Sequence, residues 1–411
     1  MKFFQSKYVW LSIASVLLLI AVTGSFTWVP FLRAERLRKQ VVKLGGSLYV
    51  GRGGPEWVYA IAFQLGHKKP LKILNHRIHW VKLGGRQSVG DEFLDVLAAF
   101  PELEQLDLSG TSVTDAGFER LRPLNALEQL DLSQTHVYGT GFGWLRNASR
   151  LRGIDFYGCP LMPDALSNLS GLTNLDSLDL TGTKVTGESL RHLMSCVALK
   201  SLALGRTQID DASLSYLVRL PNLRILVLED TSITDAGVSL LKEMPQLEYL
   251  NLSGTSITDK CASTLSELPN LQQLGIARTA FTDRGVSFLE RLPQLWRVDL
   301  SRTAVTDAAI ETIGGLPELQ DLSLAQTRVT NAGIARLGKL RPEEEHVYRH
   351  FSLNLTDCQI TEEGVAALIA LHPGWDLQCN SPPEWETDTD FAPGWVPIGF
   401  LLDSDDGGGP I

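Results

Sequence analysis

A repeat of 24 residues runs through most of this 411-residue chain and limits its fold more than any other feature. From Leu103 the sequence divides every 24 residues, without a gap, into ten units that end at Pro342. Residues 343–349 (EEEHVYR) form an insertion, and a last unit follows at 350–373. Such a period is typical of a solenoid, in which no unit can bury its own apolar face and each stacks on the next.

The pattern within a unit predicts a strand, a turn and a helix. In the first unit, LEQLDLSGTSVTDAGFERLRPLNA, positions 4 and 6 are Leu106 and Leu108, and their alternation places both on one face of a short strand. Positions 12 and 13 often read Thr-Asp, as in Thr234-Asp235, and these residue types cap helix N-termini. Position 15 is small, and positions 19 and 22 are mostly Leu, three apart on a buried helix face. We therefore expect an α/β right-handed solenoid with parallel strands on the concave side and helices on the convex side.

The repeats follow the pattern LxxLxLxxTxVTDxGLxxLxxL, which resembles the leucine-rich repeat superfamily, in the variety found in F-box-type and bacterial GALA-type proteins. The first hundred residues contain no F-box. An uncharged segment followed by RAERLRKQVVKLGGSLYV and a Pro-Glu-Trp helix resembles the membrane-anchored repeat proteins of planctomycete bacteria. The activity shared across the superfamily is protein–protein binding, so the resemblance implies a binding role and names no partner.

Position 9 forms a column of small polar residues where leucine-rich repeats place Asn or Cys. A side chain here turns inward at the end of the strand and bonds loop backbone that would otherwise be buried without a partner. We expect a structural ladder made of Thr111, Thr135, Cys159, Thr183, Thr207, Thr231, Thr255, Thr279, Thr303, Thr327 and Cys358.

The N-terminus carries a second clear signal. Behind a short flank at 1–7, residues 8–32 contain no charged residue, and about 20 apolar residues suffice to cross a bilayer. This predicts a transmembrane helix and a single-pass membrane protein, with the side of the membrane left open. The alternative is a cleaved signal peptide, because Val22-Thr23-Gly24 offers small residues for cleavage, and the chain would then be secreted or periplasmic.

The segments that flank the repeats are expected to cover the open ends of the solenoid. Residues 33–77 predict a basic juxtamembrane helix and an N-terminal capping region, and 78–102 a degenerate first repeat. Residues 374–402 are rich in Trp, Pro and acidic residues and predict a C-terminal cap. The Gly-rich and acidic residues 403–411 predict a disordered tail.

Charge and motifs argue against several functions. The net charge of −10 disfavours a nucleic-acid partner. The histidines His76 and His79 are three apart and have no third ligand nearby, and no P-loop, GxSxG or HExxH motif is present. We expect no catalytic activity, no cofactor and no metal. Nor do we expect a disulfide framework or a cysteine zinc site from the five scattered cysteines, Cys159, Cys196, Cys261, Cys358 and Cys379.

The strand face opposite the core is the expected binding surface, and one end of it is acidic. Position 5 places Asp107, Asp131, Asp155 and Asp179 on four successive strands, which stand about 4.8 Å apart. Such a strip could dock a basic partner or a cation. Alternatively, the carboxylates are solvated and bonded to neighbouring Ser and Thr side chains.

A second candidate patch combines aromatic and basic residues. Tyr249, Trp296 and Arg297 occupy positions 2 and 3 of predicted strands, while position 8, on the strand-exit rim, holds three arginines: Arg206, Arg278 and Arg302. Exposed Trp, Tyr and Arg are the usual anchors of interfaces. The alternative is that Trp296 packs sideways on its neighbours.

These features together predict a non-catalytic, membrane-tethered scaffold that binds a protein or peptide. Two rivals remain open: a soluble adaptor of a ligase-like complex, and an extracytoplasmic binder that is released by signal cleavage.

Overall fold

The computed structural model describes residues 33–51, 77–340 and 351–379. These residues fall into two compact units, an N-terminal unit (Met1–Leu151) and a C-terminal unit (Arg152–Ile411), and we describe each by itself. The insertion at 343–349, the N-terminal segment 8–32, the tail 403–411 and most of the expected C-terminal cap lie outside the described residues.

The N-terminal unit is a small sheet covered by short helices. Residues 33–43 are helical and bury Leu37 and Val41, which share one helix face. Strand β1 (Ser47–Gly51) then pairs antiparallel with β2 (Arg77–Lys82). From β2 onward the pairing is parallel, through β3 (Gln105–Asp107) to β4 (Gln129–Asp131). The helices of this unit are α3 (Asp91–Leu97), α4 (Asp115–Phe118), η2 (Glu119–Leu121) and η3 (Phe142–Asn147), where η marks a 3-10 helix.

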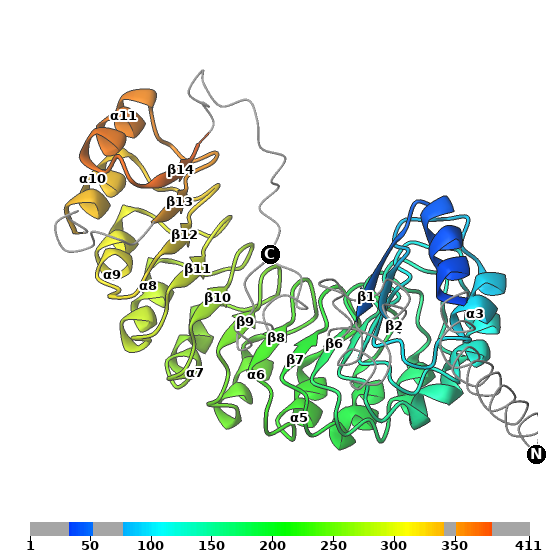
Figure 1. The fold of residues 1–411 in the computed structure, drawn as a ribbon. Helices are drawn as coiled ribbons and strands as arrows, with labels where there is room; N and C mark the ends of the chain where they lie inside the picture. Colours follow the sequence, from blue (N-terminus) through cyan, green and yellow to red (C-terminus); the bar gives the residue numbers. More distant parts are fainter. Residues whose placement is uncertain (1–32, 52–76, 341–350, 380–411) are drawn as a thin grey trace, which may run out of the picture. The chain divides into compact units, whose positions relative to one another are not determined.

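The C-terminal unit is built from three-residue strands that pair in parallel and in chain order (Figure 1). The register is the one that the period requires, with Leu226, Leu250 and Leu274 side by side on successive strands. The strands are β5 (Gly153–Asp155), β6 (Ser177–Asp179), β7 (Ser201–Ala203), β8 (Ile225–Val227), β9 (Tyr249–Asn251), β10 (Gln273–Gly275), β11 (Arg297–Asp299), β12 (Asp321–Ser323), β13 (Ser352–Asn354) and β14 (Asp376–Gln378).

Helical turns occupy the side of this unit opposite the strands (Figure 1). Many of these turns are 3-10 rather than α. Each 24-residue repeat leaves few residues for its outer side, enough for about one or two helical turns. They are η4 (Pro163–Asn168), η5 (Gly187–Ser195), η6 (Asp211–Ser213), α5 (Leu214–Leu217), α6 (Asp235–Val238), η7 (Leu241–Glu243), η8 (Asp259–Cys261), α7 (Ala262–Leu265), α8 (Asp283–Val286), η9 (Ser287–Arg291), η10 (Asp307–Ala309), α9 (Ile310–Gly314), α10 (Asn331–Leu340) and α11 (Glu362–Leu371).

The core lies between the strands and the helical turns, and it confirms the predicted solenoid of parallel strands. Leu226, Leu252 and Val305, which the repeat pattern places inside, are fully buried. The core continues to the last described strand, where the ring of Trp375 stacks on His372 with the ring centres 4.1 Å apart. Phe351 lies against the same indole at 4.5 Å, so Trp375 covers the end of the last repeat.

The expected fold class needs one correction, because it included a transmembrane helix at 8–32. Among the described residues no helix is both long enough and apolar enough to cross a membrane. Helices α10 and α11, for example, have ten residues each, about half of what a bilayer requires. The described residues therefore support the solenoid alone, and residues 8–32 lie outside them.

Candidate binding surface

The threonines of position 9 are used inside the fold. The side chain of each described threonine in the column points inward, and its hydroxyl donates to the carbonyl three residues earlier, as from Thr111 to Leu108 at 2.6 Å. In the last repeat the thiol of Cys358 donates instead to the carbonyl of Leu324 in the preceding repeat, at 2.9 Å. Cys159 is fully buried. The column therefore holds the ends of the strands and offers nothing to a ligand.

The Thr-Asp pairs of positions 12 and 13 connect neighbouring repeats, a role that sequence reasoning missed. Asp259 Oδ1 accepts from the backbone N–H of Thr282 in the next repeat at 2.8 Å, and its Oδ2 accepts from the Thr282 hydroxyl at 2.6 Å. The same two bonds join Asp211 to Thr234, Asp235 to Thr258, Asp283 to Thr306 and Asp307 to Thr330. Their sequence pattern indicated only helix caps.

The position-5 carboxylates are half-buried and engaged in local turns. Asp107 accepts from both the backbone N–H and the hydroxyl of Ser109, at 2.9 and 2.6 Å, and Asp131 accepts from Ser133 at the same distances. The pKa of Asp131 is raised, mainly because its carboxyl group is buried. The hydrogen bonds from Ser133 lower this pKa, and the neighbouring Asp107 carboxylate raises it. In the C-terminal unit, Asp155 accepts from the backbone of Tyr157 and Asp179 from that of Thr181, at 2.7 Å each.

These carboxylates therefore have a structural use in the strand-exit loops, because each accepts a backbone N–H that follows its own strand. Register pairs Asp107 with Asp131 in the N-terminal unit and Asp155 with Asp179 in the C-terminal unit. The described residues contain no group of three or more His, Cys, Asp or Glu side chains placed to hold a metal ion.

The aromatic residues of the second patch are less exposed than their sequence positions indicate. Tyr249 on β9 retains only 7% exposure, and burial raises the pKa of its hydroxyl. Trp296 is half-buried next to Arg297 on β11. Arg297 forms an ion pair with Asp321 on the adjacent β12 at 3.1 Å. Tyr249 and Arg297 share one row of the sheet, with Gln273 of β10 between them.

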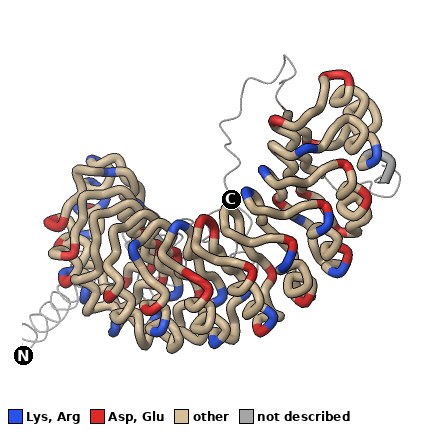
Figure 2. Tube along the Cα trace, turned by 180° about the vertical axis from the view of Figure 1, so that it is seen from behind, with Lys and Arg blue, Asp and Glu red and all other residues tan. Residues whose placement is uncertain are grey.

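The three position-8 arginines form what we call the arginine rim, Arg206, Arg278 and Arg302, at the exits of β7, β10 and β11. All three adopt positive φ, between 55° and 57°, in tight turns that follow their strands. Figure 2 shows Lys and Arg interspersed with Asp and Glu along the C-terminal unit, so charges of both signs lie near one another there.

Two members of the rim share one acidic pair. Arg278 contacts Asp230 at 2.7 Å and Glu229 at 3.0 Å, while Arg206 reaches the same two carboxylates from the other side at 3.5 and 3.6 Å. The bond between Arg278 and Asp230 passes over the intervening repeat, where position 8 is Gly254. A Cβ there would lie 2.0 Å from Asp230 Oδ1, so a side chain at this position would displace the Asp230 carboxylate.

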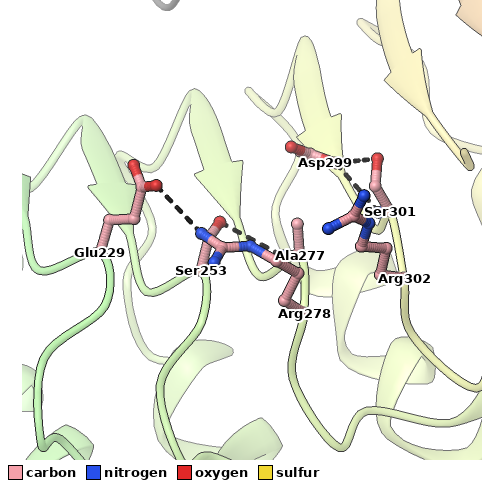
Figure 3. A pocket seen from close by; sticks show the side chains of 7 residues that line it. All are labelled: Glu229, Ser253, Ala277, Arg278, Asp299, Ser301 and Arg302. Carbon is pink, nitrogen blue, oxygen red and sulfur yellow. Dashed lines mark hydrogen bonds and ion pairs between the residues drawn. The ribbon is translucent and has the colours of Figure 1, made fainter.

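The third member, Arg302, stands beside an open hollow of about 230 Å³. Figure 3 shows the hollow between Glu229 and Arg278 on one side and Asp299, Ser301 and Arg302 on the other. The Arg302 side chain is exposed, and its guanidinium forms no ion pair with any described carboxylate. The hollow therefore presents an unpaired cation among hydroxyl and carboxylate groups.

Next to the rim, most of the outward strand face is buried over β7 to β10, although Val227 and Gln273 on the same face are half-buried; sequence reasoning missed this burial. We call this the middle face and define it by Ser201, Ala203, Ile225, Tyr249, Asn251 and Gly275, all of which are buried. On β6 and β11 the equivalent residues, Ser177, Asp179, Arg297 and Asp299, are half-buried. The available signal was the change of position 5 from Asp to Ala, Val, Asn and Gly over these strands.

The repeats and their parallel ladder have the architecture of leucine-rich repeat proteins. A family model described as "Leucine rich repeat" matches residues 221–281, and a second model with the same description matches residues 352–368. No curated protein matches the chain significantly.

The chain is similar to several solved structures, of which the internalin supports the same fold. An internalin from Listeria monocytogenes is 20% identical, with a TM-score of 0.52 over 80% of this chain and 95% of the internalin. A leucine-rich repeat protein of Leptospira interrogans is 17% identical, with a TM-score of 0.42 over 69% of this chain and 80% of its own. A plant peptide hormone receptor is 19% identical, with a TM-score of 0.42 over 69% of this chain and 46% of the receptor. Leucine-rich repeat proteins are generally non-catalytic binding scaffolds.

Proposed function

We propose that this chain is a non-catalytic scaffold that binds an acidic protein or peptide segment at the hollow beside Arg302 and along the arginine rim. The observation that carries the proposal is the unpaired, exposed Arg302 guanidinium at the edge of a hollow of about 230 Å³. The resemblance of the N-terminal part to planctomycete proteins, and the location of the chain in the cell, stay predictions.

The chemistry of the rim favours a carboxylate-bearing ligand. A guanidinium binds carboxylates through two parallel N–H···O bonds, and such charge-assisted bonds are the stronger ones in proteins. Arg206 and Arg278 already surround Glu229 and Asp230 and so hold the acidic side of the hollow in place. Arg302 therefore has hydrogen-bond capacity that a ligand can use, next to the hydroxyl of Ser301.

Binding of defined peptides to the purified full chain tests the proposal. Probes of equal length, one rich in Glu and Asp and one rich in Lys and Arg, are titrated by fluorescence anisotropy. We expect the acidic probe to bind more tightly, with an affinity that falls as salt increases. Arg302→Ala should weaken it by about 10-fold or more, as one lost charge-assisted bond predicts.

The matched control is Arg284→Ala, since Arg284 is an exposed arginine on α8, on the helical side of the same unit. This change should leave the affinity unchanged. Equal binding of the two probes, or equal effects of the two substitutions, would contradict the proposed function.

A further inference from the structure

The helix over residues 33–43 combines a buried apolar face with a strongly basic exposed face. Ala34, Leu37 and Val41 are buried in the N-terminal unit, and their spacing places them on one side of the helix. The same eleven residues contain one carboxylate, Glu35, in a chain whose net charge is −10. The helix nevertheless exposes five cations: Arg33, Arg36, Arg38, Lys39 and Lys43.

The carboxylate of this helix is already engaged. Glu35 accepts from Nε and from a terminal nitrogen of Arg38, at 2.9 Å each, and these bonds are the main reason that its pKa is lowered. Three other cations of the helix, Arg36, Lys39 and Lys43, form no ion pair with any carboxylate in the part of the chain that the structure describes. They therefore remain able to bind anions from outside the unit.

These three cations share one face of the helix, and we call them the basic row. Their spacing of three and then four residues places Arg36, Lys39 and Lys43 on the side away from Leu37 and Val41. Like charges at this spacing destabilise a helix. The helix dipole favours a cation in the last turn, such as Lys43, but its effect does not extend to the preceding turns. Folding of the helix therefore does not account for the whole row.

The surroundings of the basic row favour the surface of a bilayer as its partner. The row runs about 10 Å along an exposed helix face, at about 1.5 Å per residue. Val42 lies three residues after Lys39 and is 57% exposed, so an apolar side chain stands beside the cations. An anionic bilayer offers many mobile charged headgroups above an apolar layer. An acidic protein or a nucleic acid would match the cations but would offer no apolar layer to Val42.

We propose that the basic row docks the N-terminal unit onto the surface of a bilayer that contains anionic phospholipids. Arg36, Lys39 and Lys43 bind oxygen atoms of the headgroups, and Val42 enters the layer between them. This contact is made by the outer face of a helix that lies on the surface of its own unit (Figure 1). It is a second binding surface, separate from the hollow beside Arg302, and it would hold the scaffold at a membrane.

Co-sedimentation of the full chain with lipid vesicles tests this proposal. The vesicles consist of phosphatidylcholine alone or of an equimolar mixture with anionic phosphatidylglycerol, and the neutral vesicles measure binding that does not depend on charge. We expect tighter binding to the mixed vesicles, which weakens as salt increases. Changing Arg36, Lys39 and Lys43 together to Gln should weaken it about 100-fold, because each cation near an anionic surface contributes about 5-fold. Binding to neutral vesicles should not change.

A matched control removes three exposed cations elsewhere in the same unit, and therefore the same net charge. This second triple variant should leave binding to the mixed vesicles nearly unchanged. Its substitutions are Arg122→Gln, Arg146→Gln and Arg150→Gln.

A third variant keeps the charges of the basic row and so separates their effect from damage to the helix. Its substitutions are Arg36→Lys, Lys39→Arg and Lys43→Arg. Arg, Lys and Gln all have high helix propensity, so the helix should persist in these variants. The charge-retaining variant should bind the mixed vesicles as the unmodified chain does.

Three results would overturn the proposal. The first is equal binding of the unmodified chain to neutral and mixed vesicles, and the second is an equal loss in the two Gln variants. The third is that the Gln variant of the basic row weakens the acidic peptide probe as much as the vesicles, because the row would then recognise acidic protein. Vesicle binding should not respond to Arg302→Ala, so this proposal can fail while the proposed function stands, and the reverse.

Discussion

At the scale of single residues, the aspartate of position 13 and the small residue of position 15 are matched across neighbouring repeats. A Cβ on Gly285 would lie 2.1 Å from Asp259 Oδ1, and one on Gly333 2.3 Å from Asp307 Oδ1. The relation is reversed where position 13 is Gly187. There the next repeat carries Ser213, whose hydroxyl fills the space. The small residue of one repeat therefore makes room for the capping group of its neighbour.

This pairing predicts non-additive mutations. Asp259→Ala removes two hydrogen bonds to Thr282 and should lower the free energy of unfolding by about 1–3 kcal/mol. Gly285→Ala should also destabilise, because its methyl group displaces the Asp259 carboxylate. Combined in one chain, the changes should cost less than their sum, since the clash with the carboxylate disappears and only that with the Phe281 ring remains. Urea unfolding of the four chains measures this, and strict additivity would contradict it.

Two buried cysteines predict how stability depends on pH. Burial raises the pKa of the Cys261 thiol to about 12 and that of Cys196 to about 11, from an ordinary value of 9.0. The unfolded chain loses these protons near the ordinary value, while the folded chain keeps them. The contribution of the two thiols is therefore complete below pH 9 and is lost as the pH rises toward their folded pKa values.

The measurement is the slope of unfolding free energy against pH in this alkaline window. Wild-type stability should fall with increasing pH. In Cys261→Ala the fall should be shallower by up to about 1.4 kcal/mol per pH unit, which corresponds to one proton. Equal slopes for the two chains would mean that the Cys261 thiol ionises equally easily when folded and unfolded.

At the scale of elements, the short strands and helical turns depend on their neighbours. Three-residue strands and single helical turns are too short to be stable alone, so packing against adjacent repeats supplies most of their stability. Leu→Ala at Leu226 or Leu252, both fully buried, should therefore cost about 2–5 kcal/mol. The control is Leu371→Ala, where the side chain is 55% exposed. Similar melting temperatures for all three variants would contradict the register.

Sequence reasoning predicted the strands well because their apolar positions are fixed by the period. Leu106 and Leu250 lie on strands where the alternation places them, and the sheet is parallel in the predicted register. The form of the outer turns was not predictable in the same way, because α and 3-10 turns require the same apolar spacing over three or four residues.

The surface was less predictable than the core. Tyr249 was expected to be exposed, since its strand position faces away from the leucines, yet it is buried. The ion pair of Arg278 with Asp230 joins residues 48 apart in sequence, across a repeat that does not take part. Such contacts depend on side chains two strands away, and a one-repeat pattern carries no information about them.

At the scale of the whole molecule, a repeat array is most vulnerable at its ends. In the C-terminal unit the last repeat is covered by Trp375, which contacts His372 and Phe351. Trp375→Ala should increase hydrogen exchange in β13 and β14 first and leave β8 and β9 unchanged, because only the terminal interface is weakened. Hydrogen exchange followed by mass spectrometry resolves these segments. Uniform exchange across all strands would indicate that the unit opens as one block.

The ion pair above Gly254 has a consequence for how this array can change length. Repeat proteins gain or lose coils by duplication and deletion, and most junctions tolerate this because each coil contacts only the next. Arg278 reaches across one coil to form an ion pair with the coil beyond it. This contact limits that freedom locally. A coil inserted or deleted between Asp230 and Arg278 would separate the two charges or press them together, so this ion pair disfavours a change of copy number at this place in the solenoid.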